Sequence, residues 1–157
     1  MTRRMSIWGA GPRIGLFTLL YAVAAGAATL RWPALFTIGA IAYPYLAAAA
    51  AVLLLATVPL YVAAIVPLRK AYGEGRLVTG GAYAVCRHPL YAMWILLIMP
   101  AIALLLKSWL FFSTAVFMYV VARIEIRREE AYLEERFGRQ YAEYKRRVNA
   151  IFPTLRR

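Results

Sequence analysis

Residues 90–130 read LYAMWILLIMPAIALLLKSWLFFSTAVFMYVVARIEIRREE. Two apolar runs in this stretch, residues 90–106 and 109–122, are separated only by the dipeptide KS. A helix needs roughly 20 residues to cross about 30 Å of hydrocarbon, so the stretch predicts a tight helical hairpin in a membrane. Nothing in the charged sequence that follows breaks a helix, and we expect the second helix to continue through Glu130.

The composition of the whole chain agrees with a membrane protein. Of 157 residues 63% are hydrophobic, and 19 basic residues against 7 acidic ones give a formal charge of +12. The charges fall into three blocks, at residues 3–13, 69–87 and 123–157, which is typical of a multispanning protein. Because these blocks border membrane-length apolar runs, we expect them to meet anionic lipid headgroups and not nucleic acid.

The sequence therefore predicts an all-α polytopic membrane protein, a single domain over residues 1–157 with about four transmembrane helices. The expected spans are residues 14–30, 46–68, 90–106 and 109–125, followed by a cytoplasmic helical region at residues 126–153. Between the first two spans, Pro33 and the YPY of residues 43–45 predict a turn or a short interfacial segment.

The distribution of basic residues predicts the orientation of these spans. Four crossings place both termini and the loop at residues 69–87 on one side, with 17 of the 19 basic residues. Arg31 and Lys107 alone lie on the other side. The positive-inside rule makes the charged side cytoplasmic. The N-terminal sequence MTRRMSIWGAGPR is too polar for a secretory signal, so we expect it to remain on that side.

The segment YAVCRHPLY, residues 83–91, holds the only histidine and the only cysteine of the chain. Pro89 suits the first position of a helix, which places His88 at the helix mouth. Such a helix start is rich in N–H donors and suits a carboxylate or a phosphate, although a simple cap with interfacial aromatic residues fits the same pattern. One histidine among glutamates makes a poor set of metal ligands, so we expect no metal site. We interpret Cys86 as a packing residue.

The charged helix after the fourth span carries two further patterns. Arg123 and Glu125 should sit at the membrane boundary, where ionisable groups either serve a function or reach out to headgroups. Further along, an apolar and aromatic stripe predicts a packed tail that folds back over the loop, with a bend at Gly138. The stripe consists of Leu133, Phe137, Tyr141, Tyr144 and Val148.

Two motifs in this half of the chain resemble a known group. LVTGGAYAVCRHPLY, followed about 40 residues later by EEAYLEERFGRQYAEYKRRV, is similar to the isoprenylcysteine carboxyl methyltransferase and phospholipid methyltransferase superfamily. The resemblance covers roughly residues 68–153. It implies an integral membrane enzyme that uses S-adenosylmethionine, with the loop and the C-terminal helices forming the cofactor site near the cytoplasmic surface.

The resemblance also implies site residues. The expected cofactor-binding residues are Leu77, Val78, Tyr83, His88, Pro89, Leu90, Tyr91 and Glu129, with Glu130 beside it. The carboxyl methyltransferases place an arginine for the substrate carboxylate four residues before the cofactor glutamate, where this chain has Glu125. Arg123 and Arg127 flank that position, and we expect either of them to bind the substrate.

The acceptor implied by the resemblance is lipophilic: a carboxylate, a thiol or a lipid amine that enters from the bilayer. A carboxylate or thiolate needs no general base, whereas an amine must lose a proton, for which Glu129 or Glu130 is at hand. The sequence assigns no catalytic residue beyond this. Two alternatives remain open, an NADPH-dependent membrane reductase of related architecture and a non-catalytic lipid-binding membrane protein.

Overall fold

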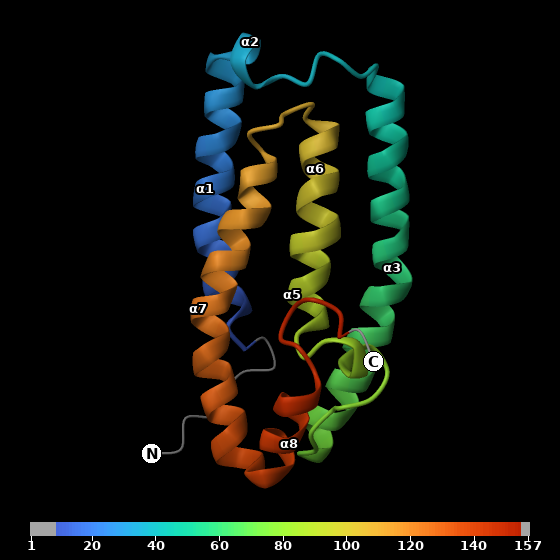
Figure 1. Cartoon of the computed structure of the whole chain (residues 1–157), viewed down its shortest axis with the longest axis vertical. Coiled ribbons are helices and arrows are strands. Elements are labelled where there is room, and N and C mark those ends of the chain that lie inside the picture. Colours follow the sequence, from blue (N-terminus) through green and yellow to red (C-terminus); the bar gives the residue numbers. More distant parts are fainter. Residues whose placement is uncertain (1–8, 155–157) are drawn as a thin grey trace.

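The computed structural model describes residues 9–154, in which four long helical rods run side by side (Figure 1). The rods are α1 (Gly11–Arg31), α3 (Tyr43–Glu74), a third rod and α7 (Phe112–Phe137); the third is built from α5 (Pro89–Met93), η1 (Trp94–Ile98) and α6 (Met99–Leu105). Short helices complete the chain: α2 (Pro33–Phe36), α4 (Ala82–Val85) and α8 (Arg139–Arg147). Within the described residues there is no strand, only an isolated bridge between Thr37 and Ser108, so the all-α prediction is confirmed.

The second rod is longer at both ends than the predicted span of residues 46–68. Pro44 occupies the second position of α3, where a backbone N–H has no helical partner, so the YPY segment starts the helix and does not break it. At the other end α3 continues past Pro67 and Gly73 to Glu74. Gly75 ends the helix in the left-handed conformation, with φ at 66°.

The third rod changes its helical form halfway. Residues Trp94–Ile98 form a π-helical turn directly before Pro100. In a regular α-helix the ring of Pro100 would clash with the carbonyl of Leu96, four residues earlier, and a π-turn widens the backbone at this point. The turn between α6 and α7 is tight, as predicted, and Lys107 adopts a positive φ of 51° within it.

The C-terminal region folds back, as the stripe of the sequence predicts. Gly138, with φ at 51°, separates α7 from α8 and so confirms the predicted bend. The helix ends at Arg147, and the prediction of helix through residue 153 is wrong for the last six residues. Their backbone pairs with the loop instead: the N–H groups of Arg87 and His88 donate to the carbonyls of Asn149 and Ala150, at 2.8 and 2.9 Å.

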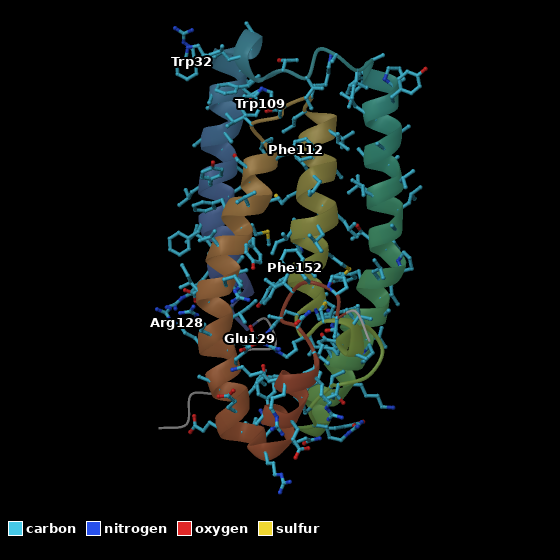
Figure 2. The ribbon with its side chains drawn as sticks, viewed as in Figure 1. Trp32, Trp109, Phe112, Arg128, Glu129 and Phe152 are labelled. Carbon is cyan, nitrogen blue, oxygen red and sulfur yellow. The ribbon has the colours of Figure 1, made fainter. Side chains whose placement is uncertain are left out.

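The two ends of the bundle differ in chemistry, as Figure 2 shows. At the end that carries α2, Trp109 Nε1 donates to the carbonyl of Leu35 at 2.7 Å. Deeper in the bundle, α1 and α7 are joined by stacked rings of Tyr21 and Phe117 at 4.3 Å, and the Tyr21 hydroxyl lies 2.9 Å from that of Ser113. Nearly all charged side chains lie at the opposite end, around α8.

The outward faces of the rods are apolar. On α1 Leu19 and Val23 are exposed, and on α3 Val52 and Leu55 are exposed, the last by 72%. By length and composition α1 and α3 could each cross a membrane, and Pro89–Leu105 is a shorter apolar helix. Exposed apolar faces of this length need hydrocarbon around them, in agreement with a membrane protein. The predicted placement of residues 1–8 and 155–157 on the cytoplasmic side lies outside the described residues.

Candidate active site

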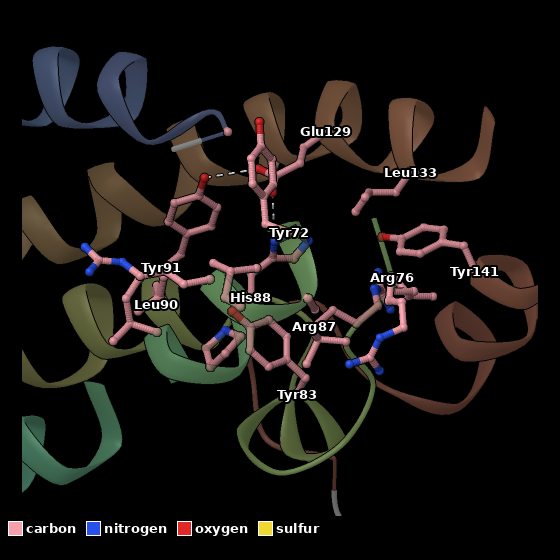
Figure 3. A pocket seen from close by; sticks show the side chains of 18 of the residues that line it. Tyr72, Arg76, Tyr83, Arg87, His88, Leu90, Tyr91, Glu129, Leu133 and Tyr141 are labelled. Carbon is pink, nitrogen blue, oxygen red and sulfur yellow. Dashed lines mark hydrogen bonds and ion pairs between the residues drawn. The ribbon is translucent and has the colours of Figure 1, made fainter. Parts of the chain in front are cut away.

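A cavity of about 410 Å³ opens at the charged end of the bundle. Its walls come from the end of α3, the loop at residues 75–88, the start of α5, and the α7–α8 hairpin (Figure 3). Eight of the nine predicted cofactor residues line it: Leu77, Val78, Tyr83, His88, Pro89, Leu90, Tyr91 and Glu129. The two separate sequence motifs therefore meet at one cavity.

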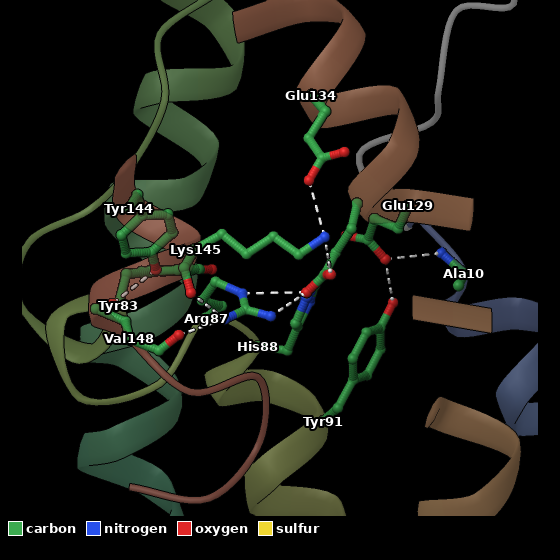
Figure 4. A network of polar contacts seen from close by, with 11 residues as sticks. Ala10, Tyr83, Arg87, His88, Tyr91, Glu129, Glu134, Tyr144, Lys145 and Val148 are labelled. Atoms are coloured by element: carbon green, nitrogen blue, oxygen red, sulfur yellow. Dashed lines mark hydrogen bonds and ion pairs between the residues drawn. The ribbon is translucent and has the colours of Figure 1, made fainter. Parts of the chain in front are cut away.

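The loop reaches this position through local turns and one arginine. Gly81 adopts a φ of 60° directly before α4, which turns Tyr83 inward, where it is buried. Arg87 then ties the loop to the tail, because its guanidinium donates to the backbone carbonyls of Lys145 and Val148. The Tyr144 hydroxyl adds a bond to the carbonyl of Tyr83 at 2.7 Å. The tail thus packs over the loop and closes one side of the cavity (Figure 4).

Glu129 presents its carboxylate to the cavity from α7. The Tyr91 hydroxyl donates to Oε2 at 3.1 Å, and the backbone N–H of Ala10 donates to the same oxygen at 3.4 Å. His88 Nδ1 lies 4.0 Å from Oε1, and the His88 and Tyr91 rings stack with centroids 5.6 Å apart. Gly9 adopts a φ of 50°, a conformation that favours glycine, where the segment before α1 lies against this carboxylate.

Glu130, one residue further, lies behind the cavity wall and does not line it. Its Oε1 pairs with Arg87 Nη2 at 2.5 Å, its Oε2 pairs with Lys145 Nζ at 3.1 Å, and His88 Nε2 lies 3.5 Å away. Burial alone would raise the pKa of Glu130, but its polar contacts with His88, Arg87 and Lys145 outweigh burial and lower the pKa to about 2. Of the two adjacent glutamates, Glu130 takes part in an ion-pair network and Glu129 lines the cavity.

Comparisons with known proteins bear on this half of the chain. Residues 64–140 match the family of phospholipid methyltransferases. This match, over just under half of the chain, supports the isoprenylcysteine carboxyl methyltransferase and phospholipid methyltransferase superfamily. The family predicted from the two motifs is confirmed.

Two curated relatives of this methyltransferase superfamily align with half of the chain. Protein-S-isoprenylcysteine O-methyltransferase B of Arabidopsis thaliana is 36% identical over 80 residues, which are 50% of this chain and 40% of the relative. Protein-S-isoprenylcysteine O-methyltransferase of Tribolium castaneum is 36% identical over 89 residues, 50% of this chain and 28% of the relative. The chain thus spans less than half the length of the relatives it matches. No solved structure matches it.

The two arginines predicted to bind the methyl acceptor do not reach the cavity. Arg123 and Arg127 are exposed on α7, and neither lines the wall that holds Glu129. At about 100° per residue, Arg127 points about 200° away from Glu129 around the helix axis. Glu125 does lie near the inward face, where it is buried and pairs with Arg128 at 3.1 Å and Arg13 at 3.6 Å.

Other cations line the cavity instead, and the sequence reasoning did not find them. Arg69 and Arg76 come from α3 and the loop after it, and Arg136 from α7. A signal for the last was present, because Glu129, Tyr132, Leu133, Arg136 and Phe137 follow the i, i+3, i+4, i+7, i+8 spacing of one helix face. All five line the cavity of the methyltransferase region.

Tyr141, predicted to serve packing, also lines the cavity. It is only 1% exposed, yet its hydroxyl has no hydrogen-bond partner among the described residues. Burial, and to a smaller extent the negative charge of Glu130, raise the pKa of this hydroxyl, so the group stays protonated. A buried, protonated hydroxyl without a partner at a cavity wall is a donor that a ligand can satisfy.

The described residues contain no cluster of three or more histidine, cysteine, aspartate or glutamate side chains that could hold a metal ion. Cys86 is buried in the core cluster, and burial raises the pKa of its thiol. A protonated, enclosed thiol is a poor nucleophile, which agrees with its interpretation as a packing residue.

Proposed function

We propose that the chain is an integral membrane methyltransferase that binds S-adenosylmethionine in the cavity and transfers its methyl group to a lipophilic acceptor. The observation that carries the proposal is the convergence of the two superfamily motifs on one cavity with the Glu129 carboxylate in its wall. A volume of about 410 Å³ lies within the range of cofactor sites. The curated relatives are methyltransferases by name.

In the membrane, the four rods α1, α3, α5–α6 and α7 each cross the bilayer, with the charged end in the cytoplasm. The third rod spans residues 89–105, which at about 1.5 Å per residue gives roughly 25 Å, enough for a short span. The apolar part of α7 ends before Arg123, where the headgroup region begins. The positive-inside bias supports this orientation.

The residues in the cavity fit S-adenosylmethionine group by group. The donor has two cationic centres, an ammonium and a sulfonium, and Glu129 supplies the carboxylate that attracts them. Arg69, Arg76 and Arg136 offer charge to its carboxylate, and the rings of Tyr83, Tyr91 and Phe137 offer faces for the adenine and for a cation. The unpartnered Tyr141 hydroxyl donates to a ribose or carboxylate oxygen.

S-adenosylmethionine supplies a methyl group already activated by the positive sulfur. The chain has to align the acceptor with that carbon and keep water out. The α8 hairpin and the backbone-paired tail cover the cavity from one side, and the Gly9–Ala10 segment lies against Glu129 from another. A carboxylate or thiolate acceptor needs no base, whereas for an amine Glu129 takes the proton, because it is the one carboxylate among the described lining residues.

The acceptor reaches the cavity from the bilayer, between α3 and η1. Tyr61 and Ile65 of α3 and Trp94 of η1 extend the cavity wall toward the apolar part of the bundle. Tyr61 and Trp94 are 42% and 44% exposed, which suits a wall that an apolar chain from the lipid can contact. An apolar chain can lie here while its reactive group points toward Glu129.

The test is calorimetric binding of S-adenosylhomocysteine to the purified full chain in detergent. We expect micromolar binding by the wild type, weakened by about tenfold or more in both Glu129→Gln and His88→Ala, because each removes a polar partner from the cavity. Glu135→Gln is the matched control: it is an exposed glutamate on the same helix, outside the cavity, and should bind as the wild type does.

Folded protein that binds no S-adenosylhomocysteine would contradict the proposal. A parallel titration with NADPH addresses the reductase alternative, and stabilisation by NADPH alone would favour it. Equal binding by wild type, Glu129→Gln and His88→Ala would show that the cofactor lies elsewhere.

A further inference from the structure

A second cavity, of about 550 Å³, lies on the other side of Arg87. It is open to the surface and is lined by Arg123 of α7, the end of α8 and the segment at residues 148–154. Its lining is mostly polar, and five basic side chains face it: Arg87, Arg123, Lys145, Arg146 and Arg147. No described carboxylate lines it. The positive charge of this cavity therefore favours an anionic ligand.

Two of these cations are already neutralised and three are not. Arg87 pairs with Glu130, and Lys145 pairs with Glu130 and Glu134. Arg123, Arg146 and Arg147 form no ion pair with any described residue, although they converge on one cavity. Three like charges held together repel one another unless an anion lies between them.

Neutral donors complete the lining. The backbone N–H of Asn149 donates to Thr154 Oγ1 at 2.8 Å, which leaves the hydroxyl proton of Thr154 free to donate outward. Asn149 lines the same cavity, and a side-chain amide carries two further N–H donors. Guanidinium groups with hydroxyl and amide donors are a typical set for a phosphate, whose oxygens accept several hydrogen bonds at once.

The cavity borders on the apolar zone of the bundle. Arg123 is the first charged residue after the apolar stretch of α7. One turn earlier Tyr119 packs against Phe152, with ring centroids 5.5 Å apart, and Phe152 is 51% exposed. Figure 2 shows Phe152 displaced from Glu129 toward the apolar end. A phosphate-binding cavity with an exposed aromatic pair on its membrane side matches a molecule that has a phosphate and acyl chains together.

We propose that this second cavity binds the phosphate of an anionic phospholipid in the leaflet at the charged end. The inference rests on the proposed membrane orientation and does not require methyl transfer. Arg123, Arg146 and Arg147 bind the phosphate oxygens, and the acyl chains pass over Phe152. Because Arg87 lines both cavities, a bound lipid also fastens the tail that covers the cofactor cavity.

The experiment is a thermal-stability titration of the full chain in a nonionic detergent. The probes are short-chain phosphatidylglycerol, short-chain phosphatidylcholine and inorganic phosphate. We expect phosphatidylglycerol to raise the Tm of the wild type in a saturable way, and Arg123→Gln/Arg146→Gln to weaken this binding by about tenfold or more. The charge-matched control Arg127→Gln/Arg139→Gln removes two exposed arginines outside the cavity and should leave binding unchanged.

Further variants separate the possible sources of the phosphate. Phe152→Ser should weaken binding of phosphatidylglycerol and leave inorganic phosphate unaffected, and Arg123→Lys/Arg146→Lys should restore part of the lipid response. Circular dichroism confirms that each variant keeps its helices. The Tm titration uses no cofactor. A failure of the lipid-binding proposal can therefore be told apart from a failure of the proposed methyltransferase function.

Four results would overturn the proposal. An equal loss of phosphatidylglycerol binding in the control variant would show that binding depends on general electrostatic attraction and not on this cavity. An equal response to inorganic phosphate would make the cavity a site for free anions, and an equal response to phosphatidylcholine would remove the requirement for an anionic lipid. A wild type that responds to none of the probes has no such site.

Discussion

The apolar end of the bundle and the charged end are held together by different forces. Toward the apolar end, the rods meet through packed side chains and a few hydroxyl pairs, such as that of Thr29 and Ser108 at 2.8 Å. Every ion pair formed by the described residues lies toward the other end, where Arg87 joins the loop to both α7 and the tail. Apolar contacts tolerate small changes, whereas a buried ionic network depends on each of its members.

The largest effect is expected for Arg87→Ala. The change leaves Glu130 buried with less compensation and removes the bonds to the Lys145 and Val148 carbonyls. Breaking one side of a buried pair costs about 3–5 kcal/mol of unfolding free energy. The counterpart at the apolar end is Arg31→Ala, which removes an exposed guanidinium 5.6 Å from the Trp32 ring centre and should cost about 0.5–1 kcal/mol. Chemical denaturation in detergent measures both changes in unfolding free energy. Equal losses in the two variants would show that the two ends do not differ in this way.

The dependence of stability on pH sharpens the same comparison. The pKa of Glu130 is lowered in the folded chain from its ordinary 4.5 to about 2. The unfolded chain therefore binds the proton more readily, so this group contributes stability above pH 4.5 that is lost as the pH falls toward 2. Glu130→Gln should be less stable at neutral pH and should show a smaller fall of Tm between these values. If the Tm of wild type and variant fell in parallel with pH, the ion-pair network would not stabilise the ionised form of Glu130.

The smallest effects separate two tyrosines of the tail. Tyr144→Phe removes a buried hydrogen bond to the Tyr83 carbonyl and should cost about 1 kcal/mol of stability. Tyr141→Phe removes a hydroxyl that has no hydrogen-bond partner among residues 9–154 and should change stability by less than about 0.5 kcal/mol. We expect it to weaken S-adenosylhomocysteine binding severalfold instead. If Tyr141→Phe binds like the wild type and is destabilised as Tyr144→Phe is, the hydroxyl serves the fold.

The apolar rods could be predicted closely from the sequence, because length and hydropathy act residue by residue. Every predicted span overlaps an observed rod, but α7 begins at Phe112 and not at residue 109. The other differences lie at proline and glycine: Pro44 lies at the start of α3 and does not break it, and the helix runs on to Gly75. Such residues end or begin helices according to their position in the turn, which composition does not reveal.

The charged end was predicted less completely, because its chemistry depends on contacts between distant segments. Glu129 and Glu130 are adjacent in sequence and differ by about 100° around the helix, so only the packing of α7 tells which one faces the cavity. The role of Arg87 depends on carbonyls 58 and 61 residues away. The motif residues of the loop were found as a group because the resemblance supplied what spacing could not.

The contact between Gly9 and Glu129 makes the first residues before α1 part of the site, although no motif includes them. A shortened chain that starts within α1 would keep all four rods and both motifs. It would nevertheless lose the N–H of Ala10 and open the Glu129 carboxylate to water on that side. Any minimal version of this protein, and any tag joined at its front, has to treat this short segment as a wall of the binding chamber.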